Sequence, residues 1–391
     1  MSGVEFFLFF KANQKILGVA FMADGLNLSR RLRRSPYTQR VEAAGVRGFS
    51  VVNHMLLPKA YHHSVEDDYW HLREHVQIWD VSCQRQVQIE GPDAARLVQW
   101  MTPRDISKAR IGQCLYVPIV DSDGGLINDP VLLKLGENCF WLSIADSDLL
   151  LFAKGLAIGA KLNVQVTEPD VSPLSVQGPK AEQLLVDLFG QGIKDVGFFR
   201  FDWFDFKGTA QLIARSGYSR QGGFEIYLAN GQLGPDLWDA VSDAGQKYNI
   251  RPGCPNLIER IEGGLFSYGN EMTRANNPFE IGLGKYCTLD GSIDCVGLIA
   301  LQQIEKSSIK REVRGVKFGE EPCGTCAEPW PLSVAGVDVG AVTSAAWSPR
   351  LKCNVGLSLV DQAYWEPGQS VEVTSSSGST MSGLISDLPI E

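Results

Sequence analysis

The order of apolar and polar positions divides the chain into a long mixed region and a shorter C-terminal region of strands. Residues 65–76 have acidic side chains early and basic ones late, which suits the dipole of a helix. Residues 86–90 alternate apolar and polar side chains like a strand, and residues 93–101 return to helical spacing. From Val313 onward, short strands broken by glycine and proline indicate a small barrel.

A strand followed by Gly-Pro and a helix occurs twice in the mixed region. The first copy covers Val87–Ala94 and the second covers Leu174–Ala181, and leucines follow each copy at helical spacing. A unit repeated across such a gap predicts two related α+β halves in one body. The alternative is that both copies are coincidental uses of a common turn.

The remaining segments of the mixed region alternate between strand pairs and helices. We expect strands at residues 116–120, 131–135, 198–206, 209–215 and 224–228, and helices at 234–248 and 256–268. The predicted fold class is therefore α+β. We expect two related α+β subdomains within residues 29–310, followed by a β-rich domain over residues 311–391.

The first 28 residues are expected to be a poorly ordered N-terminal extension. Lys11 and Lys15 interrupt their apolar stretch, whereas a signal peptide places its charges before one continuous apolar run. On this interpretation Met22 is the natural start of the chain. N-terminal sequencing of the native protein tests this expectation.

Composition narrows the classes of function. The 391 residues carry a formal net charge of −9, which disfavours a nucleic-acid binder because phosphate contacts need a basic surface. No apolar run reaches the roughly 18 residues of a membrane span. Nine irregularly spaced cysteines indicate reduced thiols. We therefore expect a cytoplasmic enzyme that acts on small molecules.

The motifs give little support for metal or nucleotide chemistry. All five histidines lie between His54 and His75, without the further ligands that a metal site needs. Cys323 and Cys326 form a lone CxxC, which is half of a zinc site, so we interpret the pair as incidental. The sequence has no glycine-rich dinucleotide or phosphate-binding motif. We expect no bound metal.

The segment from Gly124 to Pro130 is the first with candidate chemistry. Its Gly-Gly turn lets the backbone approach a ligand closely, and Pro130 favours an extended conformation for Asp129. A carboxylate presented there could bind a ligand amine. The alternative is a turn aspartate that bonds its own backbone.

A second candidate segment is the glycine-rich loop that leads into the strand at residues 224–228. Glu225 and Tyr227 lie two residues apart on this strand and therefore share one face. A glutamate inside a buried strand needs hydrogen-bond partners. Two N–H donors of a flat heterocycle would satisfy such a carboxylate.

Together these segments resemble the folate-dependent family of the glycine-cleavage T-protein. The family carries a Gly-Gly-x-x-(Asp/Asn)-Asp turn, which Gly124–Asp129 matches. It also carries a Ser/Thr-Gly-Tyr segment that ends in Gly-x-Glu-Ile, which Ser216–Ile226 matches. Glu259–Leu265 is similar to its Arg-Leu-Glu-Ala-Gly-Leu helix. The resemblance spans about residues 30–388.

Within this family, the chain looks most similar to the branch that demethylates dimethylsulfoniopropionate. The strings Arg33–Tyr37, Asn53–Pro58 and Cys114–Pro118 carry this resemblance. Cys83 stands where the T-protein usually has histidine, which favours the same branch. Tyr218 departs from the branch, because tryptophan is expected there.

The resemblance implies a three-domain ring with tetrahydrofolate bound at its centre. In that arrangement Asp129 and Tyr227 would be the catalytic residues, with Asp129 near N5 and N10 of the folate. Glu225 would bind the pterin, Tyr116 would border the reacting centre, and Arg260 would support the folate site.

The reaction implied is methyl transfer from a small sulfonium compound to tetrahydrofolate. A sulfonium has no hydrogen-bond donor, so aromatic faces hold it best. Tyr116, Tyr218 and Phe199 are candidates for this role, while core packing is the alternative for each and is favoured for Phe199. The substrate carboxylate needs a cation. The basic run Arg30–Arg34 is one option, with a solvated arm as the alternative.

Two other functions stay open at this point. An aminomethyltransferase or N-demethylase acting on glycine, sarcosine or a betaine-like amine would share the folate residues and differ in the substrate pocket. A non-catalytic, folate-binding regulatory protein would bind folate without methyl transfer. We expect no nucleic-acid or membrane partner, and a homodimer is one possible assembly.

Overall fold

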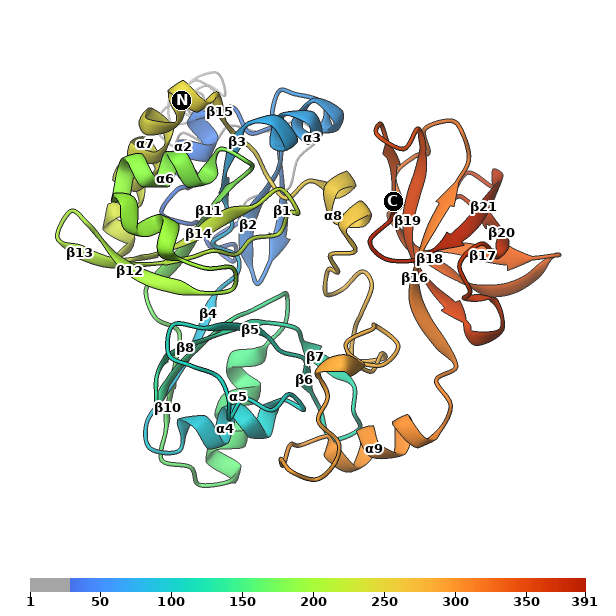
Figure 1. Cartoon of the computed structure of the whole chain (residues 1–391), viewed down its shortest axis with the longest axis horizontal. Helices are drawn as coiled ribbons and strands as arrows, with labels where there is room; N and C mark the ends of the chain where they lie inside the picture. Colours follow the sequence, from blue (N-terminus) through green and yellow to red (C-terminus); the bar gives the residue numbers. More distant parts are fainter. Residues whose placement is uncertain (1–28) are drawn as a thin grey trace, which may run out of the picture.

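Two sheets and a barrel surround a central segment of the chain in the computed structural model, which describes residues 29–391 (Figure 1). The two sheets lie one above the other in this view, and the barrel lies to their side. Helix α8 and the loop that follows it run between the three parts. The expectations for residues 1–28, including the start at Met22, lie outside the described residues.

The six-stranded sheet has the order β12-β13-β14-β11-β3-β15. Helices α6 and α7 cover it with a core that contains Leu184, Leu237 and Trp238. Its strands are β3 (Val76–Asp80), β11 (Val171–Gln177), β12 (Phe201–Phe206), β13 (Thr209–Ala214), β14 (Gly223–Ala229) and β15 (Ile250–Pro252). The accompanying elements are α2 (Thr38–Ala43), β1 (Gly48–Val52), β2 (Met55–Ala60), α3 (Val65–Glu74), α6 (Ala181–Phe189) and α7 (Gly234–Gly245).

The five-stranded sheet has the order β10-β4-β9-β8-β5 and packs against helices α4 and α5. Leu97 and Met101 of α4 and Ala153 of α5 belong to this second core. The elements are β4 (Gln86–Glu90), α4 (Ala94–Met101), β5 (Cys114–Tyr116), β8 (Val131–Gly136), β9 (Cys139–Ser143), α5 (Leu149–Gly159) and β10 (Gln165–Thr167). A short ladder pairs β6 (Ile119–Val120) with β7 (Leu126–Asn128).

The repeated strand–Gly-Pro–helix unit occupies equivalent places in the two sheets. Gly91 joins β4 to α4, and Gly178 joins β11 to α6. Both glycines have positive φ, +132° and +121°. A Cβ would lie 2.7 Å from the carbonyl oxygen of Asn163 at the first position and 2.4 Å from that of His75 at the second. Only glycine permits this close approach, which explains why the turn recurs.

The C-terminal region forms a closed barrel in the order β16-β19-β18-β17-β20-β21, as its strand pattern predicts. Val316, Trp330 and Val342 lie in its core. The strands are β16 (Arg311–Phe318), β17 (Trp330–Val334), β18 (Val337–Ser348), β19 (Cys353–Asp361), β20 (Ser370–Thr374) and β21 (Thr380–Ser386). The fold class expected from the sequence is thus confirmed.

Several element boundaries differ from the sequence prediction. The helix expected over residues 256–268 is only α8 (Leu257–Gly263), because Gly264 adopts a left-handed conformation and ends it. The strand expected at 116–120 is split between β5 and β6, with Pro118, which lacks an N–H donor, in the interval. Helices α5 and α9 (Leu298–Lys306) were not anticipated.

Candidate active site

A cavity of about 1590 Å³ lies where the three parts of the molecule meet. Residues of both sheets, of the segment after α8 and of the barrel line it. Small-molecule pockets usually measure roughly 300–1,000 Å³. The cavity is therefore large enough to hold two reactants at once.

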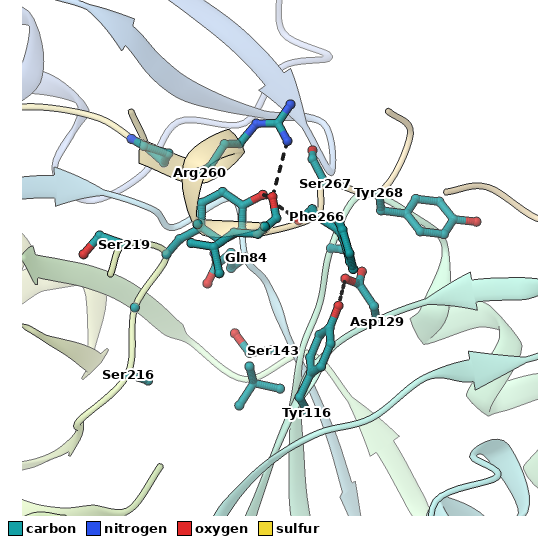
Figure 2. Close-up of a pocket in the computed structure, with 18 of the residues that line it drawn as sticks. Gln84, Tyr116, Asp129, Ser143, Ser216, Ser219, Arg260, Phe266, Ser267 and Tyr268 are labelled. Atoms are coloured by element: carbon teal, nitrogen blue, oxygen red, sulfur yellow. Dashed lines mark hydrogen bonds between the residues drawn. The ribbon is translucent and has the colours of Figure 1, made fainter. Parts of the chain in front are cut away.

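Asp129 and Tyr116 form a pair on the wall of this cavity (Figure 2). Asp129 follows β7 directly, and Tyr116 ends β5 of the neighbouring sheet. The Tyr116 hydroxyl donates to Oδ2 of Asp129 at 2.6 Å. The other carboxylate oxygen, Oδ1, is buried and has no hydrogen-bond partner within residues 29–391. A buried acceptor of this kind is rare unless a ligand or water completes it.

The surroundings of Asp129 also change its acidity. Burial raises its pKa from the ordinary 3.8 to about 7, although the hydrogen bond from Tyr116 opposes part of the change. Burial likewise raises the pKa of the Tyr116 hydroxyl well above its ordinary value, so this group stays protonated and remains a donor. Asp129 can therefore gain or lose a proton near neutral pH, which suits a general base.

Glu225 and Tyr227 lie on β14, one layer behind the cavity wall. Neither is among the described residues that line the cavity. Ser216, which does line it, donates to Oε2 of Glu225 at 2.5 Å. Tyr227 is only 1% exposed and packs against Trp141, with ring centroids 6.2 Å apart. In this structure Ser216 stands between the glutamate and the cavity.

Two further aromatic side chains expected to hold the substrate, Tyr218 and Phe199, line the cavity. Tyr218 lines it and donates its hydroxyl to the carbonyl oxygens of Phe266, at 2.5 Å, and Leu265, at 3.1 Å. Phe199 also lines it, with a positive φ of 54° that is unusual for a bulky residue. The structure thus brings both to the cavity that contains Asp129 and Tyr116.

Arg260 connects α8 to the barrel. Its guanidinium forms an ion pair with Glu271 at 3.1 Å and donates to the Ser344 hydroxyl of β18 at 2.5 Å. Glu271 in turn accepts from the backbone N–H of Ser267 at 2.7 Å. Arg260 lines the cavity, as Figure 2 shows, yet both of its terminal nitrogens already donate to protein groups. It fixes the loop after α8, which forms one wall.

Two segments considered for ligand binding lie outside the lining of the cavity. The basic run at Arg30–Arg34 does not line the cavity, and within it Arg33 pairs with Glu168 at 2.7 Å. The Gly-Gly turn brings its backbone close to neighbouring protein atoms. A Cβ at Gly125 would lie 2.4 Å from the carbonyl oxygen of Arg274.

The sequence analysis also missed residues that line the cavity. Ser216 lay inside a recognised motif, but its hydroxyl gave no signal of its own. Arg104 follows α4, and nothing in its sequence context marks it as part of a site. Within residues 29–391, no group of three or more His, Cys, Asp or Glu side chains could hold a metal ion. No helix in this range has the length and apolar character needed to cross a bilayer.

Comparison with known proteins places this geometry in a family. The GCVT N-terminal domain matches residues 37–291, and the glycine cleavage T-protein C-terminal barrel domain matches residues 311–390. The chain is 49% identical over 350 residues to the dimethylsulfoniopropionate demethylase DmdA of Ruegeria pomeroyi, covering 90% of this chain and 95% of that protein.

More distant relatives share the same architecture. An aminomethyltransferase of Listeria monocytogenes is 31% identical over 320 residues, which cover 81% of this chain and 84% of that protein. The crystal structure of the aminomethyltransferase T of Bartonella henselae superposes with a TM-score of 0.82 at 23% identity, covering 92% of this chain and 98% of that one. This chain therefore belongs to the glycine-cleavage T-protein family.

Proposed function

We propose that this protein demethylates dimethylsulfoniopropionate by transferring one methyl group to tetrahydrofolate. The products are methylthiopropionate and 5-methyltetrahydrofolate. The 49% identity over 350 residues to the dimethylsulfoniopropionate demethylase DmdA supports the choice of substrate. The observation that carries the proposal is Asp129, whose buried carboxylate oxygen lacks a partner at the edge of a cavity large enough for both reactants.

The residues present fit a reduced folate. When bound, tetrahydrofolate supplies N5, the nitrogen that receives the methyl group. The unpartnered Oδ1 of Asp129 offers an acceptor for an N–H of such a ligand. We propose that Glu225 and Tyr227 support the pterin indirectly, because Glu225 holds Ser216 in the cavity wall. We also propose that Arg260 fixes the loop after α8 through Glu271. Tyr116 keeps the Asp129 carboxylate in place.

The chemistry asks little of the protein beyond alignment and proton removal. The carbon–sulfur bond breaks, its electron pair stays on the neutral thioether, and no acid is needed for this leaving group. Alignment of two reactants can contribute roughly 7–11 kcal/mol. In the ionised form, Asp129 stabilises the positive charge that arrives at nitrogen and accepts the proton released there.

The sulfonium group is proposed to lie against aromatic faces. Tyr116, Tyr218 and Phe199 all line the cavity, and each ring face can attract a cation by about 0.5–2 kcal/mol. The Tyr218 hydroxyl is held by two backbone carbonyls, so its ring has a fixed orientation. The phenol ring of Tyr218 can therefore hold the sulfonium as the indole of the expected tryptophan would.

Product analysis tests the proposal directly. Purified protein is incubated with tetrahydrofolate and dimethylsulfoniopropionate, and the products are identified by mass spectrometry. Glycine betaine, sarcosine and glycine with a lipoyl carrier are assayed in parallel. Methylthiopropionate and 5-methyltetrahydrofolate are expected from the sulfonium only. Methylenetetrahydrofolate from glycine would favour an aminomethyltransferase, and folate binding without transfer from any donor would favour a regulatory protein.

We further propose that the enzyme works in the cytoplasm and that a homodimer is its assembly. Its nine cysteines are all free thiols, as a reducing compartment would keep them. Cell fractionation with a tagged chain tests the location. Light scattering of the purified protein tests the assembly, and a mass near 43 kDa, that of a single 42.9 kDa chain, would contradict the dimer.

A further inference from the structure

Basic side chains line the cavity from several elements, and most of them have an evident role. Seven lysine and arginine residues are among the lining residues. Arg215, Arg260 and Arg314 already form ion pairs with carboxylates at 2.5, 3.1 and 2.9 Å. The charges of these three arginines are therefore already balanced by carboxylates of the protein.

The other four cations have no carboxylate within 4.0 Å among the described residues, and burial distinguishes them. Lys59, Arg220 and Lys285 are exposed, so water solvates their charges. Arg104 alone is half-buried, and this burial lowers its pKa. A guanidinium withdrawn from water without a carboxylate is costly, and a ligand anion would offset that cost.

Arg104 also lies next to the proposed reacting centre. Its Nη1 donates to the backbone carbonyl of Tyr116 at 2.6 Å, and the hydroxyl of the same tyrosine donates to Asp129. Its guanidinium carbon lies 4.6 Å from the ring centroid of Tyr286, whose ring meets that of Tyr116 edge to face at 5.9 Å. Tyr116 therefore joins the arginine to the catalytic carboxylate.

The backbone around Arg104 is fixed before any ligand binds. The Thr102 hydroxyl accepts from the backbone N–H of Arg104 at 3.2 Å and donates to the Pro118 carbonyl at 2.7 Å. The Gln99 amide donates to the carbonyl oxygen of Arg104 at 3.0 Å. Because the Tyr116 carbonyl also holds its guanidinium, Arg104 loses little freedom when it binds a ligand.

We propose that Arg104 binds the carboxylate of the methyl donor and thereby selects sulfonium compounds that carry an acid group. This inference rests on the proposed function and names the part of the site that recognises the acid. Only two methylene groups separate the sulfur from the carboxylate in dimethylsulfoniopropionate. The cation that binds this carboxylate must therefore lie close to the reacting methyl, and Arg104 is joined to the Tyr116–Asp129 pair directly. Lys285 also lies near, with its Nζ 5.3 Å from the Tyr286 ring centroid, but it is exposed and already solvated by water.

The decisive experiment compares donors with and without the acid group. Arg104→Gln is assayed with dimethylsulfoniopropionate and with its neutral carboxamide. The control is Arg96→Gln, which removes the same charge from an exposed position on α4 outside the cavity lining. Arg104→Gln should lower kcat/KM for the acid by roughly 10- to 100-fold, as expected for a charge-assisted pair. The rate with the carboxamide should change less than about threefold, since that donor has no charge to lose.

The folate tail also carries carboxylates, so its affinity is measured too. An unchanged KM for tetrahydrofolate is expected. An increase in that KM alone would mean that Arg104 binds the tail of folate and would overturn the inference. Equal losses with the acid and the carboxamide would overturn it as well, because they would indicate a structural role through Tyr116. Arg104→Lys keeps the positive charge but loses the paired N–H donors of the guanidinium, so it should retain part of the preference for the acid.

Failure of the proposed function gives a different pattern. If the wild type demethylates a betaine in place of the sulfonium, the same comparison is made between betaine and its amide. If no methyl transfer occurs, calorimetric binding of dimethylsulfoniopropionate to the wild type and to Arg104→Gln decides the question. Binding that is weakened only in the Arg104 variant supports the inference, and equal binding to both overturns it.

Discussion

Replacing Asp129 with asparagine separates its effect on catalysis from its effect on folding. The amide has nearly the shape of the carboxylate and can still accept the hydrogen bond from Tyr116, but it cannot ionise. We expect kcat to fall by about 10²–10⁴, the usual contribution of a positioned acid or base. Folate affinity should fall less than kcat, because the substitution affects one hydrogen bond to the ligand while the cavity and its other walls stay in place.

The same substitution should stabilise the protein at neutral and alkaline pH. The native carboxyl has a pKa of about 7 against an ordinary 3.8, so the folded chain binds the proton more tightly than the unfolded chain. The stability of the wild type therefore falls as pH rises from about 4 to about 7, and levels off above that. The difference between the two pKa values corresponds to a loss of up to about 4 kcal/mol.

Urea unfolding at a series of pH values between 4 and 9 measures this difference. The stability of the variant relative to the wild type should increase from pH 4 to about 7 and then stay constant up to pH 9, whatever constant offset its packing adds. Asp123→Asn, at an exposed position of the preceding turn, is the matched control and should follow the wild type. A difference between Asp129→Asn and wild type that stays constant with pH would refute the reasoning that burial raises this pKa.

Other substitutions test separate parts of the structure. Tyr116→Phe removes a hydrogen bond that lowers the pKa of Asp129, so the rise of kcat/KM with pH should move above pH 7. An unshifted pH–rate profile would show that Asp129 does not control it. Glu271→Gln leaves the buried charge of Arg260 without its partner, and the free energy of unfolding should fall by about 3 kcal/mol in urea titrations. Gly178→Ala places a Cβ 2.4 Å from a carbonyl oxygen at positive φ, and should cost at least about 2 kcal/mol in the same assay.

The part of the site that is local in sequence could be predicted, and the part built by tertiary contacts could not. Asp129 is placed by the strand and proline next to it, so its role as a presented carboxylate follows from a short segment. Arg104 becomes distinctive only when folding buries it and leaves it without a carboxylate partner. The position of Glu225 behind Ser216 likewise depends on how the loop between β13 and β14 folds against β14, which no periodicity reveals.

The boundaries of the elements show the same limit. Helical spacing continues past residue 263, but Gly264 adopts a left-handed conformation and turns the following residues toward the cavity. A propensity argument cannot foresee this, since glycine inside a helix costs only about 1 kcal/mol. The repeated Gly-Pro turn was easier to interpret, because its glycines approach neighbouring backbone in both sheets.

The contact of Ser344 with Arg260 and Glu271 has a consequence for how the molecule unfolds. The hydroxyl belongs to the barrel, whereas the two charges belong to α8 and the loop after it. If the barrel detached, the buried charges of Arg260 and Glu271 would lose their hydrogen-bond partner Ser344, which would cost free energy. The two sheets and the barrel should consequently unfold in a single cooperative transition, and ligand binding in the central cavity should raise the melting temperature of the whole chain.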